Sequence, residues 1–117
     1  MVSLKKLLNV LYRKMFLKKM KRKGAIIGNK TVFTDLKTCK IDSTRPWLLE
    51  IGDYCVISMG VTILTHDYSL STLRRVYGDW IGEGRTTKIG NNCFIGMDSV
   101  ILMGTNIGDN VDRKSVV

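Results

Sequence analysis

The feature that most constrains the fold is a period of six. From residue 51 the chain reads IGDYCV ISMGVT ILTHDY, and from residue 89 it reads IGNNCF IGMDSV ILMGTN IGDNVD. The first place of every six is isoleucine, which accounts for seven of the eleven isoleucines: Ile51, Ile57, Ile63, Ile89, Ile95, Ile101 and Ile107. A period of six fits neither an amphipathic helix nor a half-buried strand, so it predicts an all-β solenoid of short stacked strands.

The other places of the six fit the same geometry. The fifth place is small or β-branched, with Asp67 as the exception: Cys55, Val61, Cys93, Ser99, Thr105 and Val111. The second place is often glycine or serine. In a triangular solenoid each six forms one side, the isoleucine points inward, the small residue fits the corner, and Gly, Asn or Asp permits the turn. We interpret Cys55 and Cys93 as corner fillers.

The repeat is interrupted between residues 67 and 87. Ile51 and Ile89 are 38 residues apart, which is not a multiple of six, so a segment leaves the solenoid between them. This segment is polar and contains three glycines, as expected of an extruded loop; loops of such length are usually functional or disordered. Upstream, residues 26–33 form a degenerate first repeat, and residues 34–50 are expected to be irregular, with strand pieces such as WLLEI.

The net charge of +9 comes from residues 1–23, which contain nine basic and no acidic residues, whereas residues 24–117 contain ten of each. Within residues 3–22, apolar side chains recur at helical spacing and predict a basic amphipathic helix: Leu4, Leu8, Leu11 and Met15, widened by Leu7, Val10 and Leu17. The apolar stripe either lies on an anionic membrane or, as we favour, packs on the body or on a neighbouring subunit. We therefore divide the chain into a helix, 1–23, and a β domain, 24–117.

The location of the charge also bears on partners and compartment. The basic residues lie on one short helix, and the neutral body offers no aromatic stacking platform, which argues against nucleic-acid binding. The three cysteines are widely spaced and form no C-x-x-C pair, which favours reduced thiols over a disulfide framework. No run is apolar enough for a membrane span or a signal peptide. We expect a cytoplasmic protein.

The two runs, IGDYCVISMGVTILTHDYS and IGNNCFIGMDSVILMGTNIGDNV, resemble the hexapeptide-repeat acyltransferases, especially the maltose, galactoside and polysaccharide O-acetyltransferases. The resemblance covers about residues 51–111. It implies a left-handed parallel β-helix, a homotrimer with sites between subunits, and acetyl-CoA as co-substrate without a metal. The period itself does not determine handedness.

The resemblance also gives a role to the only histidine of the chain. His66, in LTHDYS, matches the general base that the family places at the mouth of the extruded loop. A neutral imidazole there would take the proton of an acceptor hydroxyl as it attacks the thioester, and backbone N–H groups of the adjacent coil would stabilise the oxyanion.

Other contacts implied by the resemblance are less specific. We expect Asp67, Tyr68, Arg74 and Trp80 to meet the acceptor, although Trp80 equally well packs the loop on the β-helix. For acetyl-CoA, the matching positions are Gly96 and Met97, of which we expect backbone contact alone. Lys88 and Arg85 are candidates for the CoA phosphates, with solvated surface bases as the alternative.

The pattern departs from the family at its last frame position. Arg113, followed by Lys114, stands where an inward isoleucine is expected, and charges are costly inside such a prism. We expect a truncated β-helix, in which part of the cofactor site is absent.

The sequence therefore favours an acetyl-CoA-dependent O-acetyltransferase acting on a sugar or polysaccharide hydroxyl. The alternative is a truncated, non-catalytic trimerisation or scaffold module. A zinc-dependent carbonic anhydrase on the same fold needs three histidines per site, and each chain supplies one.

Overall fold

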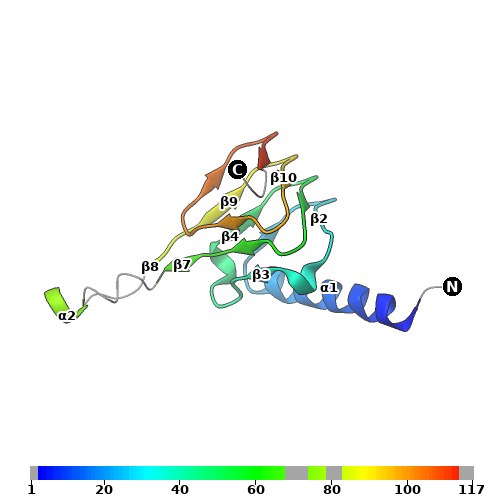
Figure 1. Cartoon of the computed structure of the whole chain (residues 1–117), viewed down its shortest axis with the longest axis horizontal. Helices are drawn as coiled ribbons and strands as arrows, with labels where there is room; N and C mark the ends of the chain where they lie inside the picture. Colours follow the sequence, from blue (N-terminus) through cyan, green and yellow to red (C-terminus); the bar gives the residue numbers. More distant parts are fainter. Residues whose placement is uncertain (1–2, 68–73, 79–82, 114–117) are drawn as a thin grey trace.

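Three parallel sheets form the body of the molecule (Figure 1). The structure is a computed structural model that describes residues 3–67, 74–78 and 83–113. Sheet A has the order β1-β4-β9-β12, sheet B the order β13-β10-β5-β2 and sheet C the order β11-β6-β3. Successive strands go from A to B to C and back to A, so three consecutive strands make one circuit around a shared interior.

The strands are short, as a six-residue side requires. Sheet A contains β1 (Ile26–Ile27), β4 (Leu49–Ile51), β9 (Thr87–Ile89) and β12 (Asn106–Ile107). Sheet B contains β2 (Val32–Phe33), β5 (Val56–Ile57), β10 (Phe94–Ile95) and β13 (Asp112–Arg113). Sheet C contains β3 (Lys40–Ile41), β6 (Thr62–Ile63) and β11 (Val100–Ile101). Residues 26–33 are thus a first repeat, as predicted.

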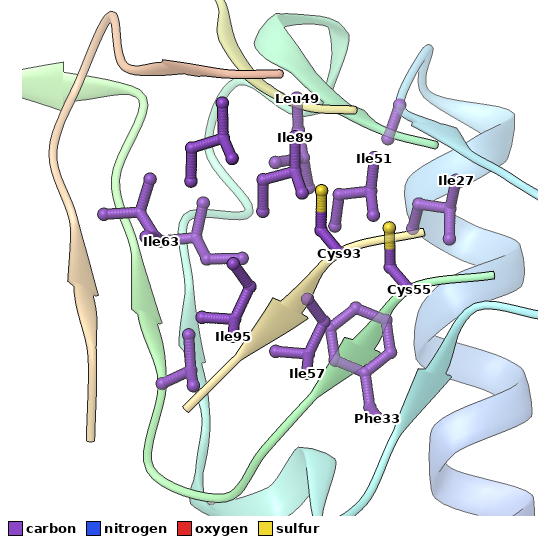
Figure 2. Close-up of a cluster of buried hydrophobic side chains, with 14 of the residues drawn as sticks. Ile27, Phe33, Leu49, Ile51, Cys55, Ile57, Ile63, Ile89, Cys93 and Ile95 are labelled. Atoms are coloured by element: carbon purple, nitrogen blue, oxygen red, sulfur yellow. The ribbon is translucent and has the colours of Figure 1, made fainter. Parts of the chain in front are cut away.

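The register places the first-place residues in three columns that fill the interior (Figure 2). Ile27, Ile51, Ile89 and Ile107 stack along sheet A, Phe33, Ile57 and Ile95 along sheet B, and Ile41, Ile63 and Ile101 along sheet C. Six of these isoleucines are at most 1% exposed: Ile51, Ile57, Ile63, Ile89, Ile95 and Ile101. The expectation of inward isoleucines on parallel strands is confirmed. Cys55 and Cys93 are buried free thiols at the corners, also as predicted.

The fourth place of the six makes the turn. Seven residues at this place have a positive φ: Lys30, Tyr54, Gly60, Asn92, Asp98, Gly104 and Asn110. Five of them are Gly, Asn or Asp, which adopt the left-handed conformation most readily. The sequence indicated Gly, Asn or Asp for the turns without assigning them to a place, and the glycines that it singled out are at the second place. There the glycines have another role, because a Cβ on Gly52 would lie 2.7 Å from the Gly90 carbonyl oxygen of the next circuit.

Residues 34–50 are more regular than expected. The 3-10 helix η1 (Leu36–Thr38) precedes β3, and η2 (Pro46–Leu48) precedes β4, so this segment finishes the first circuit and begins the second. Backbone hydrogen bonds then join it to the next circuit, among them Asp42 N–H to the Ile63 carbonyl at 3.0 Å. WLLEI contains β4, as predicted.

Helix α1 (Leu4–Arg22) runs beneath the first circuit (Figure 1). Ser3 caps its N-terminus by accepting the Lys6 N–H at 3.2 Å, and Gly24, at φ 108°, turns the chain into β1. Met20 is buried, and Phe16 and Leu17 pack against the core. Packing of the leucine stripe on the body, one part of the favoured prediction, is wrong for most of its residues: Leu4, Leu7, Leu8, Leu11 and Met15 are 47–72% exposed. Packing on a neighbouring subunit stays a prediction. Among the described residues, no helix has the length and apolarity needed to cross a membrane.

Candidate active site

The candidate site lies where the chain passes from sheet C to sheet A. We call this the C–A corner; it comprises residues 42–44 in the first circuit, 64–66 in the second and 102–104 in the third. In the third circuit Gly104, at φ 79°, makes the turn at the fourth place. His66 occupies the fourth place one circuit earlier, but it is extended and belongs to a strand. The chain therefore leaves the body at His66 because the turn is not made there.

A two-stranded hairpin begins at this point. Strand β7 (His66–Asp67) pairs antiparallel with β8 (Glu83–Gly84), and His66 lies opposite Gly84. Two hydrogen bonds close the base of this excursion: Arg85 N–H donates to the Thr65 carbonyl at 3.0 Å, and the Thr87 hydroxyl donates to the Leu64 carbonyl at 2.7 Å. The body thus holds both ends of the excursion, and the position of His66 is set by fully buried neighbours, Thr65 and Thr87.

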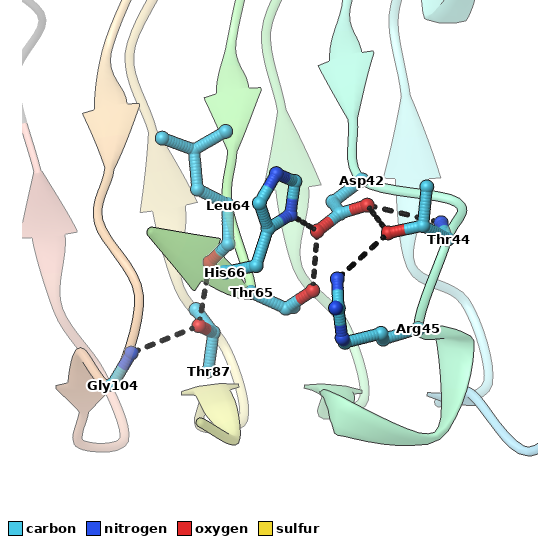
Figure 3. A network of polar contacts seen from close by, with 8 residues as sticks. All are labelled: Asp42, Thr44, Arg45, Leu64, Thr65, His66, Thr87 and Gly104. Atoms are coloured by element: carbon cyan, nitrogen blue, oxygen red, sulfur yellow. Dashed lines mark hydrogen bonds and ion pairs between the residues drawn. The ribbon is translucent and has the colours of Figure 1, made fainter. Parts of the chain in front are cut away.

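Asp42 is the polar centre of the corner (Figure 3). One carboxylate oxygen accepts the Thr44 N–H at 3.0 Å and the Thr44 hydroxyl at 2.6 Å. The other accepts the Thr65 hydroxyl at 2.7 Å and contacts Nδ1 of His66. The side chain of Asp42 is 2% exposed, whereas that of His66 is 26% exposed. A buried carboxylate therefore supports a partly accessible imidazole.

The protonation state of Asp42 follows from these contacts. Burial by itself would raise its pKa, but hydrogen bonds from the Thr44 hydroxyl, the Thr65 hydroxyl, the Thr44 backbone and His66 outweigh burial. They lower the pKa of Asp42 well below its ordinary value, so the group is a carboxylate at neutral pH.

A carboxylate only accepts hydrogen bonds, so Nδ1 of His66 must be the donor in their contact. In a neutral ring this fixes the tautomer, and Nε2 then carries the lone pair. Figure 3 shows the second ring nitrogen on the side of the ring away from Asp42. The pair can thus act as a base at Nε2, and the carboxylate would stabilise the imidazolium that forms.

Of the predicted acceptor residues, only Asp67 is next to His66 in the described structure. Asp67 is the exposed second residue of β7. Arg74 is the first residue of α2 (Arg74–Tyr77), which lies beyond the hairpin and away from the three sheets (Figure 1). Tyr68 and Trp80 fall outside the described residues. The structure therefore does not bring Arg74 to His66 within one chain.

The predicted cofactor residues lie in three separate places. Arg85 is at the C–A corner, because its backbone bonds to Thr65 and its side chain lies beside Gly104. Lys88 is exposed on the outer face of sheet A, in register with Glu50. Gly96 and Met97 lie between β10 and β11, at the corner between sheets B and C. There the Gly96 N–H donates to the Arg113 carbonyl at 2.6 Å.

Asp42 and its two threonine partners were missed by the sequence analysis. Asp42 precedes His66 by 24 residues and lies in the segment expected to be irregular. The period of six does not find it, because Ile41 follows Phe33 by eight residues instead of six. The register, in which Ile41 and Ile63 share a column, brings Asp42 to this corner. In the described part of the chain, no three His, Cys, Asp or Glu side chains gather closely enough to hold a metal ion.

Comparison with known proteins agrees with this architecture. A family model described as the hexapeptide repeat of succinyl-transferase matches residues 49–65 and 86–112, on either side of the excursion. Protein CapG of Staphylococcus aureus is 36% identical over 101 residues, covering 79% of this chain and 58% of CapG. The chain thus spans little more than half the length of this curated relative. No solved structure matches it. The six-residue repeat, the inward isoleucine columns and these two matches show that the chain belongs to the hexapeptide-repeat family.

Proposed function

We propose that this protein is a left-handed parallel β-helix acyltransferase that moves acetyl from acetyl-CoA to a hydroxyl of a sugar or polysaccharide-type acceptor. The observation that carries the proposal is the contact between His66 Nδ1 and the buried Asp42 carboxylate at the one corner of the second circuit where the chain leaves the body. The family match to a transferase repeat supports the reaction class.

In the proposed reaction, His66 Nε2 accepts the proton of the acceptor hydroxyl while the hydroxyl oxygen attacks the thioester carbonyl carbon. A C–O bond forms, the C–S bond breaks, and the imidazolium returns its proton to the departing thiolate. No covalent intermediate on the protein is required. Asp42 keeps its negative charge throughout and stabilises the imidazolium between the two proton transfers.

The surroundings of His66 fit part of the expected binding site. Arg85 brings a guanidinium to the C–A corner, where it could meet a CoA phosphate. Asp67 adjoins the base and could accept a hydrogen bond from a second hydroxyl of the acceptor. Lys88 lies on β9, the strand that follows Arg85 in the chain. Tyr68, Arg74 and Trp80 remain proposed acceptor contacts.

We further propose a homotrimer. The outer face of sheet B has an apolar column in which Val32, Val56 and Phe94 are register neighbours, with Val32 and Phe94 44–45% exposed. A contiguous apolar column on an exposed sheet face is typical of a subunit contact. Assembly would also give Gly96 and Met97 their proposed role in binding acetyl-CoA. Within one chain they lie at a different corner from His66, so they can contribute only to the site of a neighbouring subunit.

The test is release of CoA thiol from acetyl-CoA with a panel of saccharide hydroxyl acceptors, comparing wild type with His66→Gln. Turnover by wild type that falls about a thousandfold in the variant would support the general base. Undiminished turnover in His66→Gln would refute it. If wild type neither turns over nor binds acetyl-CoA in calorimetry, the chain is instead a non-catalytic trimerisation module.

A further inference from the structure

Helix α1 has two apolar faces, and only one of them is used by the body. The face toward the body contains the buried Met20 and the half-buried Asn9, Val10, Arg13, Phe16 and Leu17. Arg13 fixes this orientation by donating to the Phe33 carbonyl at 3.4 Å. The orientation of α1 is therefore set by specific contacts, and its opposite face is turned away from the sheets.

The outward face is apolar over its first three turns. Leu4 and Met15 are more than 70% exposed, and Leu7, Leu8 and Leu11 are 47–52% exposed. These five residues follow helical spacing of three, four and seven, so they lie on one side of the helix. An exposed apolar patch of this extent on a soluble domain marks an interaction surface.

Basic side chains continue and flank this patch. Lys18, Lys19 and Arg22 lie one to two turns beyond Met15 and border a shallow groove whose apolar floor includes Met15 and Phe16. Lys5 and Lys14 are exposed along the edges of the leucine patch. Residues 1–23 include no acidic residue. A helix face with apolar and cationic side chains and no acidic residue is complementary to an apolar layer covered with negative charges.

We propose that the outward face of α1 docks the protein on the anionic surface of a lipid bilayer, with the helix in the plane of the headgroups. The leucines and Met15 enter the acyl boundary while Lys18, Lys19 and Arg22 meet lipid phosphates. A second copy of the chain fits this face less well, because two such helices would bring like charges together and the rest of each chain has no net charge to offset them.

The test is cosedimentation of the full-length chain with vesicles of phosphatidylcholine, with and without phosphatidylglycerol. We expect binding to the anionic vesicles only, and weaker binding in high salt. Leu8→Gln/Leu11→Gln is expected to lower the partition coefficient about a hundredfold, and Lys18→Gln/Lys19→Gln about 30-fold, at a factor of about five for each charge.

Matched controls change the same residue types on the body. Leu102→Gln alters a leucine that is 61% exposed on the body, at the C–A corner, and Lys30→Gln/Lys40→Gln removes two exposed charges. Both controls should bind as wild type does. Equal losses in controls and α1 variants, or no binding by wild type, would overturn the proposal. So would loss of oligomers in Leu8→Gln/Leu11→Gln by sedimentation velocity without vesicle binding by wild type, since the face would then be a contact between copies. Enzymatic activity does not enter this test, so its outcome is independent of the proposed function.

Discussion

Two corners of the same body are built on opposite principles. At the corner between sheets A and B, every circuit repeats one arrangement: Asp53 accepts the Asn29 N–H at 2.8 Å, Asn91 accepts the Asp53 N–H at 2.7 Å, and Asp109 accepts the Asn91 N–H at 2.7 Å. At the C–A corner no circuit repeats another: Asp42 comes from the first, His66 from the second and Gly104 from the third. Repetition gives each circuit the same stacking contacts, whereas the varied corner brings different chemical groups together.

The largest expected effect tests whether chemistry is confined to the C–A corner. His66→Gln should lower kcat about a thousandfold, because it removes the base that Asp42 orients. Asn92→Ala changes a fourth-place residue at the A–B corner and should leave kcat within a factor of about two while lowering stability by about 1 kcal/mol. Thiol-release assays and urea denaturation measure the two quantities. A similar loss of kcat in both variants would remove the distinction between the corners.

The second prediction concerns close stacking at the A–B corner. Gly52→Ala would place a Cβ 2.7 Å from the Gly90 carbonyl oxygen and should cost about 3 kcal/mol of unfolding free energy. Gly108 occupies the equivalent place in the last described circuit, where a Cβ would have no neighbour within 4 Å. Gly108→Ala should therefore change stability by less than about 0.5 kcal/mol. Equal destabilisation in urea titrations of the two variants would contradict the stacking argument.

Asp42→Asn separates positioning from binding at the C–A corner. The amide keeps the shape of the carboxylate but cannot stabilise an imidazolium equally well, so we expect kcat to fall about 50-fold, near 2 kcal/mol. KM for acetyl-CoA should stay within about twofold, since the residue is buried behind the ring. Steady-state kinetics provide the readout. A change in KM with unaltered kcat would mean that Asp42 shapes the binding site instead.

The free energy of unfolding at acidic pH should also reveal the contribution of Asp42. Its pKa is lower in the folded chain than in the unfolded chain, so the stability that its carboxylate contributes is complete above about pH 4 and is lost as pH falls further. Urea unfolding between neutral pH and about pH 3 should therefore show a loss, of which Asp42 supplies about 1 kcal/mol. Asp42→Asn should flatten that slope. An unchanged slope in the variant would show that other carboxylates cause the acid sensitivity.

The smallest effect concerns the ladder at the A–B corner. Asn91→Ala removes the side-chain acceptor of the Asp53 N–H and should cost about 1 kcal/mol, seen as a fall of roughly 4 °C in Tm. Activity at the distant C–A corner should not change. An increase in Tm would show that the ladder does not stabilise the stack.

The body could be predicted because one physical requirement recurs in every circuit. Each side must fill the same interior, so isoleucine returns at the first place and its burial follows from the period alone. The turn at the fourth place was equally available in principle, since Gly60, Asn92, Asp98, Gly104 and Asn110 are of the types that adopt a positive φ. It was missed because glycine at the second place is more conspicuous, although there it serves close stacking.

The site could be predicted only in part, because its residues do not repeat from one circuit to the next. His66 stands out as a break in the period, but Asp42 is linked to it through the stacking of circuits and leaves no local pattern. The helical spacing of apolar residues likewise could not predict which face of α1 turns toward the body. Both its faces carry apolar residues, and contacts such as that of Arg13 with Phe33 decide which face turns inward.

The hydrogen bond from Thr87 to Leu64 has a consequence for how such proteins diversify. It fastens the two ends of the excursion to each other, and Gly104 shows the short turn that can stand in the same place. Insertions, deletions or exchange of residues 67–83 therefore need not change the register of the stacked strands in the three sheets. Under the proposed function, new acceptor preferences could be grafted at this junction while His66 and Asp42 stay where they are.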